Sequence, residues 1–194
     1  MNAPYSAAYV TIEFMLQILS GKLQRASLNP KYPKTTRPVT SQMLRQIFDI
    51  LGEVKCNVLD LFAGTGVFGF EAISRGATHA TLVEKNLECC RLIEAFALQH
   101  NIQDQLTIKY TDAKSFAFDR QYDLIFVDPP YEQNMLNKSL DNVANQIHQE
   151  GLIVTKSSKR EEIRNAHLEC LRKEIHGDSV VCFLKKAIPK SHTQ

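Results

Sequence analysis

Long apolar runs are missing from this sequence of 194 residues, and so is any segment that resembles a signal peptide. A helix that crosses a membrane needs roughly 18 consecutive apolar residues, so the sequence predicts no membrane partner. We therefore expect a cytoplasmic protein. Charge of one sign is scarce as well: the formal net charge is only +2, which does not by itself indicate a nucleic-acid-binding protein.

Paired metal ligands are also absent. The five cysteines form no C-x-x-C motif and no histidine stands at metal-ligand spacing beside them, so we expect no metal site. An odd number of cysteines, with Cys89 and Cys90 adjacent, is typical of reduced thiols rather than of a disulfide framework. What remains is an ordinary globular composition, 44% hydrophobic and 23% charged, and a length that suggests one domain.

The order of the elements is the first positive signal, because strand-like and helix-like segments alternate from residue 57 onward. The expected strands are 57–63, 79–84, 106–110, 122–128, 151–156, 171–176 and 179–187. The expected helices are 41–52, capped by Ser41, and 66–77, 86–100 and 135–149. This order predicts an α/β protein: a seven-stranded, mostly parallel sheet with helices on both faces, an antiparallel C-terminal hairpin and a small N-terminal extension.

A glycine-rich loop follows the first of these strands. Gly64, Gly66 and Gly69 satisfy G-x-G-x-x-G between a strand and a helix, and Glu84 closes the next strand twenty positions after Gly64. Glycines allow a sharp turn and a close approach of the backbone to a ligand, and the carboxylate suits ribose hydroxyls. The pattern predicts a nucleotide site; the simpler alternative is that the glycines serve only the turn and that Glu84 is a solvated strand end.

Two further features argue against a nicotinamide cofactor. Asp60 stands four residues before Gly64, where a carboxylate is awkward beside a pyrophosphate but suits a cationic group such as an α-amino group or a sulfonium. The strand at 122–128 ends in Asp-Pro-Pro-Tyr, residues 128–131, which hydride transfer does not require. Prolines cannot continue a sheet ladder, so the strand must stop there, and mere termination of the strand is the plain alternative.

With both motifs present, the chain resembles the class I methyltransferases that depend on S-adenosylmethionine and have a Rossmann-like fold. The resemblance implies that the glycine loop and the acids at the strand ends bind this cofactor, with S-adenosylhomocysteine as the product. Asp112 matches the acid that faces the adenine in that fold. The cofactor residues implied in this way are Asp60, Phe62, Ala63, Gly64, Gly66, Gly69, Glu84, Lys85, Asp112, Ala113 and Asp128.

The tetrad resembles the [D/N]-P-P-[Y/F] motif of enzymes that methylate amino groups on nucleobases. The resemblance implies that Asp128, Pro129, Pro130 and Tyr131 form the acceptor site. The Asp128 carboxylate and the Pro129 carbonyl are suited to hold the hydrogens of an exocyclic amine, whose lone pair then points toward the methyl group. Tyr131 would stack on the base. Either Asp128 or water takes the departing proton.

Several blocks further resemble the RsmD family of 16S ribosomal RNA guanine-N2 methyltransferases: DLFAGTGVFGFEAISRGA, VDPPY, GLIV and HGDSVVCF occur in the same order. The implied partner is 16S ribosomal RNA, within a small ribosomal subunit or an assembly intermediate. The front segment departs from the family, since Gln42 and Leu44 stand where arginines are usual. The RNA-binding residues implied by the resemblance are Lys22, Arg25, Lys34, Arg37 and Arg45. Further residues that we place along the RNA surface are Lys156, Lys159 and Arg160.

This interpretation divides the chain into four parts: an extension at 1–14, an RNA-contacting segment at 15–52, a methyltransferase domain at 53–187 and a tail at 188–194. Two alternatives stay open. The acceptor could be another amino group, in a DNA adenine, a different RNA guanine or a protein glutamine. The chain could also be a catalytically silent module that binds RNA or the ribosome.

Overall fold

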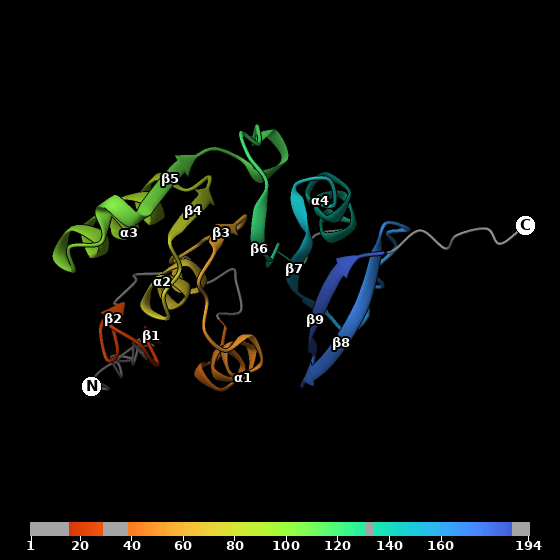
Figure 1. The fold of residues 1–194 in the computed structure, drawn as a ribbon, viewed down its shortest axis with the longest axis horizontal. Coiled ribbons are helices and arrows are strands. Elements are labelled where there is room, and N and C mark those ends of the chain that lie inside the picture. Colours follow the sequence, from red (N-terminus) through yellow and green to blue (C-terminus); the bar gives the residue numbers. More distant parts are fainter. Residues whose placement is uncertain (1–15, 29–38, 131–133, 188–194) are drawn as a thin grey trace, which may run out of the picture.

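Seven strands form one sheet in the structure, a computed structural model that describes residues 16–28, 39–130 and 134–187 (Figure 1). The sheet has the order β5-β4-β3-β6-β7-β9-β8. Its strands are β3 (Asn57–Asp60), β4 (His79–Glu84), β5 (Leu106–Tyr110), β6 (Tyr122–Val127), β7 (Ile147–Ser158), β8 (Leu168–His176) and β9 (Ser179–Lys186). The first five of these run parallel, and β9 lies antiparallel between β7 and β8. The predicted α/β class and the antiparallel hairpin are confirmed.

The direction in which strands are added reverses beside β3. After β3 the chain adds β4 and β5 on one side, and it then returns to add β6 and β7 on the other side. In open α/β sheets, ligands bind at such a switch point, beyond the carboxyl ends of the strands. The carboxyl ends of β3 and β6 therefore mark the place where a site is expected.

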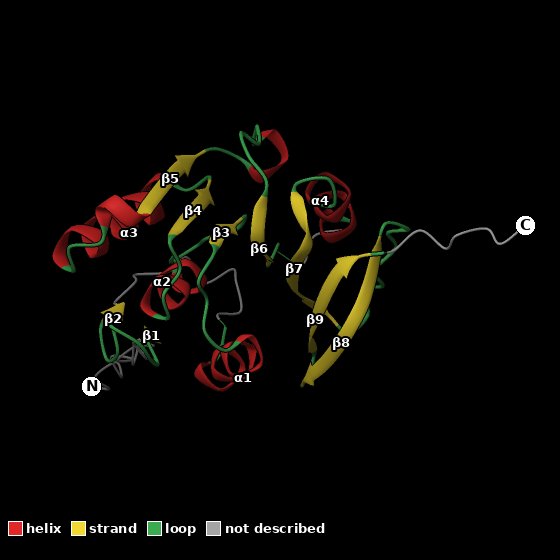
Figure 2. Ribbon diagram, in the orientation of Figure 1, coloured by secondary structure: helices red, strands yellow, loops and turns green. Residues whose placement is uncertain are grey.

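Helices cover both faces of the sheet (Figure 2). The helices α1 (Ser41–Leu51), α2 (Val67–Ser74) and α3 (Leu87–Gln99) contribute to one hydrophobic cluster, and α4 (Met135–Val143) contributes to the other. The side chains of β6 alternate accordingly, with Leu124 and Phe126 in the first cluster and Ile125 and Val127 in the second. No helix in the described ranges is long and apolar enough to cross a bilayer.

A short N-terminal hairpin, formed by β1 (Leu16–Gln17) and β2 (Ser27–Leu28), packs on the end of α2. The Leu19 amide donates to the Glu71 carboxylate at 2.9 Å, and the Leu23 amide donates to Ser74 Oγ at 2.9 Å. Gly21, with φ +81°, lies so close to this helix end that a Cβ would stand 1.9 Å from the Ser74 carbonyl oxygen. The hairpin thus requires glycine at this position.

The boundary between α4 and β7 differs from the prediction. We expected a helix over 135–149, but α4 ends at Val143 and β7 begins at Ile147. Ile147 is fully buried, and the register shifts between Tyr122 and Leu124 where β7 pairs with β6. Gly151 lies inside this irregular stretch and its missing Cβ would meet Ile147 at 2.7 Å, so the glycine marks a bulge and not the start of the strand.

Two smaller predictions are also wrong. Thr40, and not Ser41, caps α1, because its Oγ1 accepts a hydrogen bond from the Met43 amide at 3.2 Å. The strand expected over 57–63 ends at Asp60, because the next residues turn into the glycine loop.

Candidate functional site

Four acidic residues lie at the carboxyl ends of the parallel strands, as the sequence predicts. Asp60 ends β3, Glu84 ends β4, Asp112 follows β5 and Asp128 follows β6. Backbone hydrogen bonds hold these strand ends together: the Leu61 amide donates to the Phe126 carbonyl at 3.1 Å, and the Thr111 amide donates to the Glu84 carbonyl at 3.1 Å. The four acidic residues therefore lie along one edge of the sheet, with Asp128 and Glu84 near Asp60.

The Asp60 carboxyl group is the most unusual feature of this edge. It is fully buried, and neither oxygen accepts a hydrogen bond from any described residue. Burial raises the pKa of Asp60 to about 8, and the nearby carboxylates of Asp128 and Glu84 raise it as well. The Gly69 and Phe62 backbone N–H groups lower this pKa in part, without making hydrogen bonds of good geometry. A cation placed here would stabilise the charged carboxylate.

The glycine loop has a different role at each glycine. Gly64 has φ +54° and nothing within 4 Å of the place where a Cβ would stand, so a ligand can approach its backbone. Gly66 has φ +78°, which a residue with a side chain rarely adopts. Gly69 lies within α2, where a Cβ would meet the Leu82 side chain at 2.9 Å. The third glycine therefore serves close packing of the helix on β4 rather than contact with a ligand.

Glu84 is fixed by the backbone on both sides. One oxygen accepts from the Gly64 amide at 2.8 Å and the other accepts from the Asn86 amide at 2.8 Å. A carboxylate offers about four lone-pair sites, so two remain for the hydroxyl groups of a ligand. These hydrogen bonds tie the end of β4 to the glycine loop and leave acceptor capacity on the Glu84 carboxylate.

The other predicted cofactor residues lie at the same edge. Asp112 caps the short helix η2 (Ala113–Ser115), and its Oδ1 accepts from the Lys114 amide at 2.9 Å. Ala113 is buried, and Lys85 is exposed directly after β4. Phe62 and Ala63 belong to the turn after β3, where the Ala63 amide donates to the Val83 carbonyl at 2.9 Å. The edge can therefore hold a ligand that carries both a cationic group and hydroxyl groups.

Asp128 makes an ion pair that we did not predict. Lys156 Nζ lies 2.8 Å from Asp128 Oδ1 and 3.0 Å from Oδ2, and the two side chains are 6% and 18% exposed. Burial raises the pKa of Asp128, while Lys156 lowers it. Our placement of Lys156 on the RNA surface is wrong, because it is buried in β7. A lysine inside an apolar strand was the available signal, since a buried lysine needs an acidic partner.

The rest of the tetrad follows Asp128 at the end of β6. Pro129 is buried and Pro130 is half-buried. Tyr131 lies outside the described residues, as do Lys34 and Arg37 among the residues expected to bind RNA. The structure thus brings Asp128 and Pro129 to the edge that carries Asp60, as the sequence predicts.

The basic residues of the front segment do not all lie at this edge. Lys22 donates to the Gln105 side chain, which precedes β5, and the Lys22 amide donates to the carbonyl of Ser74, the last residue of α2. Both contacts are at the amino edge of the sheet, and Arg25 belongs to the same hairpin turn. Strands of this length put the two edges roughly 13–20 Å apart. Lys22 and Arg25 are therefore remote from Asp128, whereas Arg45 is exposed on α1.

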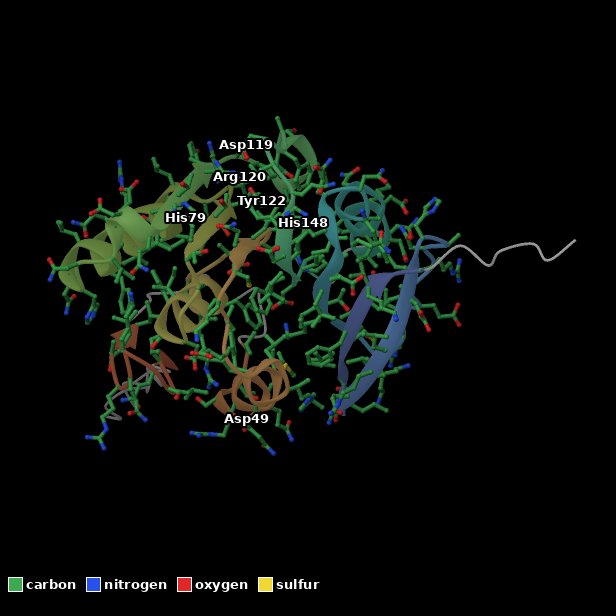
Figure 3. All side chains as sticks on the ribbon, in the orientation of Figure 1. Asp49, His79, Asp119, Arg120, Tyr122 and His148 are labelled. Atoms are coloured by element: carbon green, nitrogen blue, oxygen red, sulfur yellow. The ribbon has the colours of Figure 1, made fainter. Side chains whose placement is uncertain are left out.

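Other titratable groups lie at the amino edge, among them His79 and Tyr122 (Figure 3). His79 begins β4 and its Nε2 lies 2.8 Å from Thr107 Oγ1, while Tyr122 begins β6. Burial and the nearby Arg120 lower the pKa of His79. Within the described ranges, no group of three or more metal-ligating side chains converges anywhere.

Comparison with known proteins places the chain among methyltransferases. A sequence model of the family described as "Conserved hypothetical protein 95" matches residues 16–185. The chain is 30% identical over 175 residues to "Ribosomal RNA small subunit methyltransferase D" of Buchnera aphidicola from Acyrthosiphon pisum, covering 87% of this chain and 92% of that protein. It is 28% identical to "Putative rRNA methyltransferase YlbH" of Bacillus subtilis, covering 88% of this chain and 99% of the relative.

Solved structures have the same fold. A putative methyltransferase from Escherichia coli superposes with a TM-score of 0.78 at 24% identity, covering 89% of this chain and 98% of that one. A putative methylase from Haemophilus influenzae gives a TM-score of 0.75 at 18% identity, covering 90% and 99% of the two chains. The predicted class I methyltransferase fold is therefore confirmed.

Proposed function

The chain belongs to the family described as conserved hypothetical protein 95, and from this premise we propose that it is an S-adenosylmethionine-dependent methyltransferase of 16S ribosomal RNA. Relatives that match most of its length carry names of small-subunit ribosomal RNA methyltransferases. The finer proposal is that the acceptor is the exocyclic N2 amine of a guanine, within a small ribosomal subunit or an assembly intermediate.

The observation that carries this proposal is the unpaired carboxyl group of Asp60. Its pKa of about 8 shows how strongly the site opposes a bare negative charge, and the Asp128 carboxylate beside it adds to that effect. A nucleotide with a pyrophosphate group would add negative charge and increase the repulsion at these carboxyl groups. S-adenosylmethionine instead brings two positively charged groups, an ammonium and a sulfonium. The charge of the site therefore favours this cofactor over a dinucleotide.

The residues at the carboxyl edge would share the cofactor between them. S-adenosylmethionine supplies a methyl group on a positively charged sulfur. Asp60 and the open backbone at Gly64 are suited to its methionyl part, and Glu84 keeps two lone-pair sites for the ribose hydroxyls. Asp112 follows the next strand and is proposed to face the adenine.

Asp128 and Pro129 are proposed to hold the acceptor. The amine of guanine is a weak nucleophile because its lone pair is delocalised into the ring. The Asp128 carboxylate and the Pro129 carbonyl can accept its two N–H hydrogens, which turns the lone pair toward the methyl carbon. The new N–C bond would form as the methyl–sulfur bond breaks and a neutral thioether leaves. The Asp128 carboxylate would stabilise the positive charge gained by the nitrogen, which would then release a proton to solvent or to Asp128.

Labelled methyl transfer tests the proposal. Small subunits from a strain that lacks its own enzyme of this type should accept methyl groups from wild-type protein, and mapping of the modified nucleotide should identify the N2 position of one guanine. We expect Asp128→Ala to bind S-adenosylhomocysteine normally and to lose transfer by about 100-fold or more. Transfer to DNA or to a protein amide instead, or to no nucleic acid, would contradict the assigned substrate.

A further inference from the structure

Lys156 is a charged residue in an unusually buried place. It lies within β7, between Thr155 and Ser157, and all three residues are buried. Lysine is almost never fully buried unless it is paired, because its ammonium loses hydration. Here the ammonium contacts both oxygens of Asp128, at 2.8 and 3.0 Å.

The strand order sets this pair. β7 adjoins β6, with Val127 paired to Thr155, so Asp128 and Lys156 are each one residue past that pair. On its other side β7 adjoins β9, where Lys156 pairs with Val181. The pairing of β6 with β7 therefore presents the carboxylate and the ammonium to each other at the carboxyl edge.

Lys156 also borders a groove of about 530 Å³ between α1 and the β8–β9 turn. Gln42 and Gln46 of α1 line one wall, and His176 and Asp178 line the other. Lys156 therefore both lines this groove and pairs with the Asp128 carboxylate.

We propose that Lys156 is the positioning residue of the acceptor site: it holds the Asp128 carboxylate charged and correctly turned for the amine of the acceptor. This inference rests on the proposed methyltransferase function. The bidentate contact leaves lone pairs of the carboxylate available, because each oxygen can accept a second hydrogen bond. A protonated Asp128 would offer one of its oxygens as a donor and would hold the amine less well.

The charges around Asp128 make such a partner necessary. Asp60 approaches it from β3, with Glu84 beyond it on β4, and both are acids. The groove beside Lys156 adds Glu174, His176 and Asp178 from β8 and its turn. Among the described residues, Lys156 supplies the cationic group that contacts Asp128 directly. Burial raises the pKa of Asp128, and without Lys156 it would favour the protonated form of this carboxyl group.

A purely structural ion pair predicts different behaviour. Lys156→Met removes the cation without adding a larger group, and it leaves the largely buried Asp128 carboxylate without its partner. A loss of stability is therefore expected under either role, and only the pH dependence of transfer separates the two roles. The matched control is Lys185→Met on β9, which removes a lysine that lies 3.8 Å from the exposed Glu169. A structural role for Lys156 would change stability but not the pH dependence of transfer.

The experiment measures methyl transfer by both variants from pH 5 to pH 9, together with the affinity for S-adenosylhomocysteine. The acid limb of the pH–rate profile is the low-pH range in which protonation of Asp128 reduces the rate of transfer. In Lys156→Met we expect this acid limb to move to higher pH by about one unit or more, since Lys156 lowers the pKa of Asp128. On that limb the rate falls about tenfold for each unit of the shift. Lys156→Arg should restore the limb, and Lys185→Met should match the wild type. An unmoved limb in Lys156→Met overturns the proposal.

A second measurement does not depend on the acceptor. Carbon-13 NMR titration of the Asp128 carboxyl group should give a higher pKa in Lys156→Met than in the wild type. Lys156→Gln keeps a hydrogen-bond donor but loses the charge, so it should raise the pKa of Asp128 as Lys156→Met does. It replaces Lys156→Met in the experiment if the methionine variant does not fold. An unchanged titration of Asp128 would refute the role of Lys156. A wild-type protein that transfers no methyl group to RNA would instead contradict the proposed function.

Discussion

At the scale of single residues, Asp60 links the site to the stability of the fold. Its pKa is about 8 in the folded chain, whereas an aspartate in an unfolded chain has a pKa of about 3.9. Between these values the unfolded chain has lost the proton that the folded chain still holds, so unfolding releases a proton. The contribution of Asp60 to stability is thus fully present below about pH 4 and is lost as the pH rises toward 8.

Asp60→Asn should remove this dependence. We expect the free energy of unfolding of the wild type, relative to that of the variant, to fall between pH 5 and pH 8 by up to about 1.4 kcal/mol per pH unit. Urea unfolding at several pH values, without cofactor, measures the difference. If the two proteins follow parallel curves, Asp60 titrates normally and its carboxyl group is not as isolated as the structure indicates.

Asp60 and Lys156 also show what residue patterns can and cannot reveal. The place of Asp60 at the carboxyl end of a strand was predictable, because it depends on a position before Gly64 within one local motif. Lys156 was not placed correctly, because its contact with Asp128 exists only once β7 lies beside β6. The sequence spacing of 28 residues between the two carries no signal of that kind.

At the scale of elements, a buried ion pair joins three parts of the fold. Glu71 of α2 is fully buried, and its carboxylate lies 2.8 Å from Arg75 Nε. The Arg75 guanidinium lies 5.1 Å from the centre of the Phe48 ring on α1 and donates to the Phe48 carbonyl at 3.3 Å. Because Glu71 also accepts from the Leu19 amide, the pair connects α1, α2 and the N-terminal hairpin.

Arg75→Met should therefore destabilise the protein by about 3–5 kcal/mol, because Glu71 would keep a buried charge without its cation. Urea unfolding gives this value, and the double variant Glu71→Gln with Arg75→Met should recover much of it. Lys55→Met is the control, since Lys55 and Glu53 form an exposed pair that contributes about 0–1 kcal/mol. An equal effect of Arg75→Met and Lys55→Met would show that the buried pair does not hold the hairpin in place.

Prediction of the elements succeeded where side-chain periodicity is strong and failed at boundaries. The alternation of strands and helices gave the sheet and its two helical layers. The end of α4 was misplaced because Ile147 continues an apolar pattern that suits either a helix or a strand. Only pairing with β6 decides between them, and that pairing is a contact between distant parts of the chain.

At the scale of the whole molecule, the two edges of the sheet are chemically different. The carboxyl edge carries Asp60, Glu84, Asp112 and Asp128 together, whereas the N-terminal hairpin is packed at the amino edge. A large RNA could touch both edges, but only the carboxyl edge adjoins the proposed acceptor site. The position of a basic residue in the fold should therefore decide its effect on RNA binding more than its position in the sequence does.

Charge reversal separates these contributions. Arg45 is exposed on α1 between two glutamines that line the groove. Arg45→Glu should therefore weaken binding of the RNA substrate. The plot of log affinity against log salt concentration should become less steep by about one, the amount expected for the loss of one phosphate contact. Lys22→Glu should have a smaller effect, because Lys22 is bound to Gln105 at the far edge. Binding titrations at several salt concentrations measure both slopes. A larger loss in Lys22→Glu would mean that the RNA docks first on the N-terminal hairpin and reaches Asp128 around the side of α1.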